Sequence, residues 1–378
     1  MDLKNLKDWL YRCPKCNSCK YIYKDYSKSC PSGEKFHWET YWGSGRVWMA
    51  YALKNGELQW SDSIIKAIFA CPTCGNCAEQ CEQEIKDHLI DIYEALRAEA
   101  VKSGYGPMPE HKIYAKFAAE KHNPYNEAHE ERTNWMKNPI TMKDNAKILY
   151  FVGCTSSYRE KEIANATLEI LNKLNLDFTV SKDEWCCGSP LLRTGQIDNA
   201  KNLIAHNIEL FKKMGIKKII TSCAGCFRTL NKDYPDFKDL GIEIQHISDF
   251  LLEKMKDTSL KEINIKVTYH DPCHIGRHSG LFDSPRQVIQ SIPGIDLVEM
   301  KRIRENAWCC GAGGGVKSAF KDWAVEIATE RVKEAEETGA DILLSSCPFC
   351  RRNLNDAIKK SGSNIKMMDI VEFLQDRI

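Results

Sequence analysis

The stretches Trp185-Cys186-Cys187-Gly188 and Trp308-Cys309-Cys310-Gly311 decide the architecture of this chain. A single cysteine precedes each stretch and a Cys-x2-Cys pair follows it. The complete sets are Cys154, Cys186, Cys187, Cys223 and Cys226, and then Cys273, Cys309, Cys310, Cys347 and Cys350. Corresponding members lie about 119–124 residues apart. The chain therefore repeats one unit, which predicts two structural copies in a pseudo-two-fold arrangement.

Short apolar runs precede the repeated cysteines. Residues 148–152, 218–221, 267–269 and 342–344 each end shortly before a cysteine, and residues 164–174 and 323–337 have helical patterns. Each run reads as a buried strand followed by a cysteine-bearing loop. Strands that alternate with helices predict α/β units with parallel strands, whose carboxyl ends gather ligands.

The bulk composition excludes some classes of function. The 378 residues suggest two or three domains. The 53 basic and 52 acidic side chains nearly balance, so the chain lacks the excess of positive charge expected of a nucleic-acid binder. No apolar run approaches the roughly 18–20 residues that cross a bilayer. The first residues have no apolar stretch resembling a signal peptide. We expect a cytoplasmic protein that reaches a membrane only through a partner.

Eighteen cysteines in such a chain need a metal or catalytic explanation. A reducing compartment disfavours disulfides, and disulfide-rich secreted scaffolds are usually short. Every cysteine here also falls into a local spacing of metal-binding type. We therefore expect the cysteines to hold metal clusters.

The N-terminal cysteines have the spacing of bacterial-type [4Fe–4S] ligation. Three thiolates of each run bind one cubane, and the fourth cysteine of a run serves the other cubane. The predicted ligands are Cys13, Cys16, Cys19 and Cys81 for one cubane, and Cys71, Cys74, Cys77 and Cys30 for the second. Pro31 follows Cys30 as expected, whereas Glu82 follows Cys81. Zinc is the alternative, but runs of three cysteines with a remote fourth fit cubanes better.

The repeated five-cysteine pattern resembles the CCG domain of heterodisulfide reductase. Its gaps are 31 and 35 residues in the first copy and 35 and 36 in the second. A ferredoxin module followed by two CCG domains resembles the D-subunit family of membrane-linked heterodisulfide reductases over nearly the whole chain. It is also similar to iron–sulfur subunits of glycolate and lactate oxidation and of electron-transfer-flavoprotein-linked oxidoreductases. The resemblance implies a noncubane [4Fe–4S] cluster on each set of five cysteines, and hence two cubane and two noncubane clusters.

The expected fold is α+β overall. An α-helical two-cluster ferredoxin module, residues 1–100, precedes a helical connector, 101–145. Two α/β CCG domains follow at 146–260 and 261–378, as a pseudo-two-fold pair.

Two functions are consistent with these features. In the first, electrons enter the two cubanes and pass to the CCG clusters, where a small-molecule disulfide is reduced in two electrons. In the second, the chain relays electrons between a flavoprotein and a quinone, a cytochrome or another enzyme. Either requires partner subunits, such as a flavoprotein or a cytochrome b, because the sequence has no flavin or haem motif. Complete cysteine sets favour the first function, whereas the breadth of the family favours the second.

The catalytic candidates are Cys187 and Cys310, one from each set, together with two nearby histidines. His274 and His278 either protonate a product thiolate or have a capping or packing role, and both readings stand. For His270 a structural role is favoured. Arg277 either faces an anionic substrate or makes a surface ion pair.

Several residues beside the cysteines are candidates for shaping the cluster sites. Gly188, Gly311 and Gly313 let the backbone approach a cluster and supply amide donors. The glycine-rich stretch at 311–315 lacks a nucleotide-binding fingerprint. Trp185 and Trp308 are expected to be apolar covers that exclude water.

Overall fold

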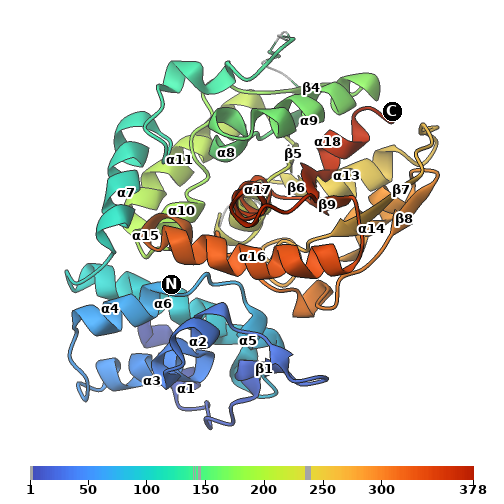
Figure 1. Ribbon diagram of the computed structural model, residues 1–378. Coiled ribbons are helices and arrows are strands. Elements are labelled where there is room, and N and C mark those ends of the chain that lie inside the picture. The colour runs from blue at the N-terminus through green and yellow to red at the C-terminus, as the bar shows by residue number, and fades with distance from the viewer. Residues whose placement is uncertain (1–2, 139, 141, 144–145, 235–239) are drawn as a thin grey trace.

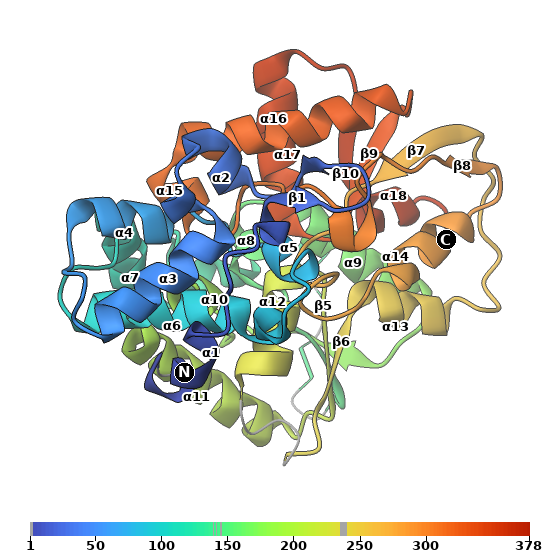
Figure 2. The same cartoon turned by 90° about the horizontal axis from the view of Figure 1, so that it is seen from below.

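The structure is a computed structural model that describes residues 3–138, 140, 142–143, 146–234 and 240–378. A helical N-terminal module lies below a larger part that contains two parallel sheets and their covering helices (Figure 1). Figure 2 shows the same arrangement from the side of the module. Among the described residues, no helix combines the length and apolar character needed to cross a membrane.

Amphipathic segments give the N-terminal module its helices. In α6, Leu89, Ile92, Leu96 and Ala100 recur at helical spacing and are all buried in one apolar cluster. The helices are α1 (Lys7–Leu10), α2 (Pro31–Phe36), α3 (Gly43–Lys54), α4 (Asp62–Phe69), α5 (Asn76–Glu79) and α6 (Leu89–Lys102). A short antiparallel hairpin of β1 (Tyr21–Ile22) and β2 (Ser27–Lys28) adds to the expected helical fold.

The first repeat is built on a four-stranded parallel sheet with the order β4-β3-β5-β6. Its strands are β3 (Ile148–Tyr150), β4 (Phe178–Thr179), β5 (Lys218–Thr221) and β6 (Glu243–His246). Its helices are α8 (Cys154–Tyr158), α9 (Lys161–Lys173), α10 (Ser189–Leu192), α11 (Ile197–Met214), α12 (Ala224–Arg228) and α13 (Ile247–Lys254). Ile219 and Ile220 in β5 are both fully buried, because helices cover both faces of such a sheet.

The second repeat has the same strand order, β8-β7-β9-β10, and is also parallel. Its strands are β7 (Ile265–Tyr269), β8 (Ile295–Leu297), β9 (Ile342–Ser345) and β10 (Lys366–Asp369). Its helices are α14 (Asp283–Gln290), α15 (Val316–Ala319), α16 (Lys321–Glu337), α17 (Pro348–Ser361) and α18 (Ile370–Leu374). The prediction of parallel strands that precede the cysteines is therefore confirmed in both repeats.

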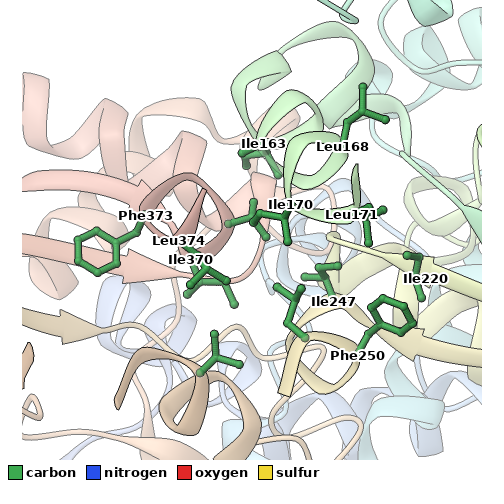
Figure 3. Packing of buried hydrophobic residues seen from close by; sticks show 14 of the residues in the cluster. Ile163, Leu168, Ile170, Leu171, Ile220, Ile247, Phe250, Ile370, Phe373 and Leu374 are labelled. Atoms are coloured by element: carbon green, nitrogen blue, oxygen red, sulfur yellow. The ribbon is translucent and has the colours of Figure 1, made fainter. Parts of the chain in front are cut away.

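One apolar core joins the two repeats. Ile163 and Ile170 from α9 lie in the same cluster as Leu374 from α18, and Ile247 from α13 belongs to it as well (Figure 3). Each fully buried Ile or Leu contributes about 1.5–3 kcal/mol relative to exposure. This shared core fixes the two sheets, and hence the cysteine loops at their strand ends, relative to each other.

The segment between the module and the first repeat is also structured. Helix α6 ends at Lys102, just beyond the boundary expected at residue 100, and α7 (Pro109–Lys121) follows. Pro109 is the first residue of α7, a position that tolerates a missing N–H. Positions 139, 141, 144 and 145 of the expected connector and 235–239 of the expected first CCG domain lie outside the described residues.

Candidate iron–sulfur site

The strand ends position the repeated cysteines. Cys223 follows β5 and is the N-cap residue of α12, and Cys347 follows β9 and is the N-cap residue of α17. The Cys223 sulfur accepts a hydrogen bond from the backbone N–H of Cys226 at 3.4 Å, as a helix-capping group does. Because parallel strands present their carboxyl ends at one edge, these loops collect the remaining cysteines around them.

In the first set, defined as Cys154, Cys186, Cys187, Cys223 and Cys226, all five thiols are buried. Cys154 interacts with Cys186, and Cys187 interacts with both Cys186 and Cys226. Hydrogen bonds from Cys186 and Cys226 lower the pKa of Cys187 to about 6. The set therefore favours a thiolate at Cys187 even before a metal is bound.

The second set, defined as Cys273, Cys309, Cys310, Cys347 and Cys350, repeats this arrangement. The sulfurs of Cys310 and Cys350 lie 3.2 Å apart, and Cys309 interacts with Cys273 and Cys310. Hydrogen bonds from Cys309 and Cys350 hold the pKa of Cys310 well below its usual range. Cys310 thus corresponds to Cys187 in both motif position and thiolate character.

The two sets meet at Cys223 and Cys347, whose thiols share a hydrogen bond. This bond and a second one with Cys350 hold the pKa of Cys347 well below its usual range. The two repeated sets are therefore in contact, and nine of their ten cysteines are buried, Cys273 being the exception.

The N-terminal cysteines form two further groups. In the outer set (Cys13, Cys16, Cys19 and Cys81), burial raises the pKa of Cys81, and its three partners lie close enough to raise it further. In the inner set (Cys30, Cys71, Cys74 and Cys77), burial raises the pKa of Cys30 to about 12, with contributions from Cys71 and Cys74. Cys16 is exposed, whereas the four members of the inner set are buried. The outer set is thus the one that reaches the surface.

Gly43 separates the outer and inner sets. A Cβ at this position would lie 2.9 Å from the Tyr93 hydroxyl oxygen, 3.1 Å from the Cys77 Cβ and 3.5 Å from the Cys19 sulfur. The Tyr93 hydroxyl donates to the Gly43 carbonyl at 3.1 Å. A residue without a side chain is therefore needed to bring the two sets this close.

The inner set adjoins the second repeat through Cys74 and Cys309. The hydrogen bond with Cys309 lowers the pKa of Cys74 to about 6. Arg277 fixes this junction, because its Nε donates to the Cys74 carbonyl at 2.7 Å and its Nη1 donates to the Ala307 carbonyl at 2.8 Å and the Glu305 carbonyl at 3.1 Å. The hydrogen bonds of Arg277 among the described residues all go to backbone carbonyls, and its charge also interacts with nearby thiols and with Glu79.

The predicted glycines lie at close backbone contacts. The N–H of Gly311 donates to the Cys309 sulfur at 3.2 Å. A Cβ on Gly313 would lie 2.7 Å from the Pro72 carbonyl, so this glycine meets the N-terminal module. Gly188 has a φ of 88° and precedes α10, a conformation that side chains rarely adopt.

His274 and His278 of the second repeat lie together between the inner set and the first repeat. Their ring centroids are 4.8 Å apart, and the Nε2 atoms of both lack a hydrogen-bond partner among the described residues. A Cβ on Gly75 would lie 3.0 Å from His278 Nε2, and one on Gly225 would lie 3.7 Å from both His274 Nδ1 and the Cys223 sulfur. Both histidines lie on a turn rather than on a helix.

The two tryptophans differ in their surroundings. Trp308 is 2% exposed and donates its Nε1–H to the Ile327 carbonyl, as expected of an apolar cover. Trp185 is half-buried and lies between the rings of His122 and His206, with centroids 3.6 Å away on each side. The cover over the first set is therefore an aromatic stack that includes a connector residue.

Sequence reasoning missed a buried ion pair beside the first set. Arg132 pairs with Glu184, and its Nη1 donates to the Cys154 sulfur at 3.6 Å. Glu184 also accepts from the N–H groups of Val152 and Gly153, both at 2.9 Å. The pair therefore anchors the loop of Cys154, and the connector contributes half of it. A single arginine in a connector carries no local pattern that would have identified this role.

The donor atoms fit iron–sulfur clusters. All eighteen cysteines are free thiols, and all but Cys16, Cys81 and Cys273 are buried. Buried thiols that gather in groups without forming disulfides are ligands for soft metals. Several thiolates within reach of one another suit iron–sulfur clusters. His270 adjoins the second set, since a ring nitrogen lies within 4.8 Å of the Cys310 and Cys350 sulfurs.

Comparisons with known proteins agree with this geometry. Residues 148–231 and 267–355 match the cysteine-rich CCG domain, and residues 9–85 match the 4Fe-4S dicluster domain. The D subunit of a dihydromethanophenazine:CoB–CoM heterodisulfide reductase from Methanosarcina barkeri is 40% identical over an alignment of 388 positions that covers 97% of this chain and 93% of that protein. The chain belongs to the family of heterodisulfide reductase D subunits.

A second member of the family, from Methanosarcina mazei, is 43% identical over 320 residues that cover 82% of this chain and 78% of its own. The resemblance expected from the sequence is therefore confirmed, and iron–sulfur clusters are shown as the cofactor class. A crystal structure of a hypothetical protein from Helicobacter pylori shares the fold, with a TM-score of 0.60 at 12% identity. It covers 99% of this chain and 76% of that one.

Proposed function

We propose that this chain is an oxidoreductase component that takes electrons through its N-terminal module and reduces a disulfide at the junction of its two repeats. The observation that carries the proposal is the buried contact of Cys223 with Cys347, which brings two complete five-cysteine sets together. The relatives in the family are named for a CoB–CoM heterodisulfide and dihydromethanophenazine. A small-molecule disulfide is accordingly the expected substrate here.

Two cubane and two noncubane [4Fe–4S] clusters are the proposed cofactors. The outer and inner sets supply four thiolates each, and each repeated set supplies five, which is one more than a cubane requires. When bound, such clusters transfer electrons singly, whereas cleavage of a disulfide needs two. Two sets in contact would bring both electrons to the same place.

The proposed pseudo-two-fold relation between the repeats has its own support. The two sheets have the same strand order, and helices pack reciprocally across the repeats, α9 on α18 and α13 on α14. Helices α9 and α14 each follow the first cysteine of their repeat, and α13 and α18 are the last helices of the first and second repeats. Reciprocal contacts of this kind are what a two-fold axis requires. They favour CCG domains at about 146–260 and 261–378, after a ferredoxin module at 1–100 and a connector at 101–145.

The chain's own residues have distinct proposed roles. Cys187 and Cys310, whose pKa values are lowered by neighbouring thiols, would hold metal, and a substrate sulfur could take the place of either thiolate as the metal's ligand. Burial lowers the pKa of His274 to about 3 and that of His278 well below its usual range, so both rings are neutral. Their unpartnered Nε2 atoms would pass two protons from solvent to the two product thiolates rather than supply stored ones. The proposed reaction is balanced, because one S–S bond accepts two electrons and two protons and gives two thiols. Gly188, Gly311 and Gly313 would allow close backbone approach.

The proposed partners are other redox subunits, such as a flavoprotein or a cytochrome b, with any membrane contact made through them. The exposed Cys16 supports the outer set as the place where electrons enter. No partner is needed for the central test, because a small reduced dye can replace it.

The experiment uses anaerobically purified protein with reduced viologen and a set of small-molecule disulfides. We expect disulfide-dependent oxidation of the dye and about 16 irons per chain. Cys187→Ser and Cys310→Ser should abolish turnover and leave the cubane signals intact. An iron content of about 8 would contradict the noncubane assignment. Failure with every disulfide, together with rapid reduction by a flavoprotein, would instead favour a relay.

A further inference from the structure

His270 distinguishes the second repeat from the first. It lies three residues before Cys273, where the first repeat has Phe151 three residues before Cys154. The backbone is equivalent at the two positions, because Phe151 N–H donates to the Ile220 carbonyl and His270 N–H to the Leu344 carbonyl, both at 2.8 Å. The repeats therefore differ at this position in the side chain and not in the strand geometry.

The side chain of His270 is 1% exposed and faces sulfur. One of its ring nitrogens and the sulfurs of Cys310 and Cys350 lie within 4.8 Å of one another. The Cys310 thiol also interacts directly with His270. Phe151 has no donor to offer the first set and instead packs edge-on against Phe211, with ring centroids 6.1 Å apart.

A buried arginine determines which ring nitrogen of His270 carries the proton. Arg331 Nε donates to His270 Nδ1 at 3.1 Å, so Nδ1 is an acceptor and the neutral ring carries its proton on Nε2. Arg331 is itself fixed, since its Nη1 donates to the Arg302 carbonyl at 2.7 Å and to Glu334 at 2.6 Å. His270 Nε2 has no hydrogen-bond partner among the described residues.

We propose that His270 is a positioning residue whose Nε2–H donates a hydrogen bond to the sulfur of the second set and makes that site easier to reduce than the first. The inference rests on the proposed function, because it requires a cluster on the second set. His270 is a donor here and not an extra metal ligand, since a proton occupies the Nε2 lone pair and Arg331 engages Nδ1. A hydrogen bond to sulfur stabilises the more negative, reduced state and so raises the reduction potential.

The proposed asymmetry would give the pair of sites a direction. The second set adjoins the inner set at Cys74, and the first set lies beyond the Cys223–Cys347 contact. An electron that arrives from the N-terminal module would therefore be held first at the second site. The first site, without the histidine, would be the stronger reductant of the two.

The test is a redox titration of the iron-loaded protein, followed by electron paramagnetic resonance. Replacing the donor in His270→Phe, which copies the first repeat, should lower the potential of one repeat site only. The expected change is about tenfold in the one-electron equilibrium, or about 59 mV. His270→Gln keeps an N–H donor and should recover at least half of this shift. Phe151→Leu is the matched control and should leave the second-site potential unchanged.

A measurement without any substitution keeps the inference testable if His270→Phe loses iron. Protein labelled with ¹⁵N-histidine should show a weak nitrogen coupling, transmitted through a hydrogen bond, in the signal of the second site. A strong coupling typical of a bound nitrogen, no coupling at all, or an unchanged potential in an iron-replete His270→Phe variant would overturn the inference. About 8 irons per chain in the unaltered protein would instead overturn the proposed function, and the inference with it.

Discussion

The Cys74 thiol of the N-terminal module lies against the Cys309 thiol of the second repeat. Among the described residues, contacts between thiols join the inner set to the second set at this point, and the second set to the first at Cys223 and Cys347. The cysteine sets therefore follow one another in a fixed order. The order begins at the surface with Cys16 of the outer set, continues through the inner set and the second set, and ends at the first set. The order gives the following predictions.

Replacing Arg277 by Met should loosen the junction. The side chain donates hydrogen bonds to carbonyls on both sides of the junction, so its loss should destabilise the protein by about 2 kcal/mol and slow electron transfer from the module to the repeats. Chemical unfolding and freeze-quenched reduction measure these two effects. Arg12→Met removes an exposed arginine that pairs with Glu84 inside the module and serves as the control. Equal transfer rates in the two variants would contradict the role given to Arg277.

Breaking the Arg132–Glu184 pair should be costly. Both side chains are at most 2% exposed, and loss of one member leaves the other charge buried without its partner. Arg132→Met should therefore reduce the free energy of unfolding by about 3–5 kcal/mol. The double variant Arg132→Met/Glu184→Gln should recover part of this loss, because neither charge remains. Lys116→Met removes one member of an exposed pair, with no measurable change expected. A single variant as stable as this control would refute the anchoring role.

Stability should depend on pH through His111. This histidine is fully buried and donates to the Gly315 carbonyl at 3.0 Å, and burial lowers its pKa from 6.5 to about 4. The unfolded chain then binds more protons than the folded chain between pH 6.5 and about 4. The contribution of His111 is therefore complete above pH 6.5 and is lost as the pH falls through this range, by up to about 3 kcal/mol.

Unfolding at pH 7 and pH 5 checks the His111 prediction. His111→Gln should show a smaller loss of stability between these values than the unaltered protein. His37→Asn is the control, because His37 is exposed and asparagine tolerates its left-handed conformation. An identical pH dependence in His111→Gln and the unaltered protein would exclude this histidine as the source.

The strands and their parallel arrangement could be predicted because each signal is local. Apolar runs such as 218–221 end shortly before a cysteine, and repeated spacing marks equivalent positions. The contact of Cys223 with Cys347 could not be predicted, since it depends on how the two sheets pack across their shared core. The role of Arg132 was equally hidden, because its partner lies in another segment and no local motif joins them.

His270 shows a different limit of sequence reasoning. A histidine at the end of a buried strand is typical of a structural residue, and a structural role is what the sequence favours. Its proximity to Cys310 and Cys350 follows from the packing of β7 beside β9, where Tyr269 pairs with Leu344. Register of this kind is set by the whole sheet and not by neighbouring residues. The structure therefore places His270 at the edge of the cluster site.

The most direct test of the central claim compares Cys309→Ser with its positional equivalent in the first repeat, Cys186→Ser. Each iron-loaded variant is mixed with reduced viologen and freeze-quenched, and the signals of the two repeat sites are followed in time. The proposed order predicts that Cys186→Ser leaves the second site filling at the unaltered rate, whereas Cys309→Ser slows both sites. Rapid reduction of the first site in Cys309→Ser would contradict the account.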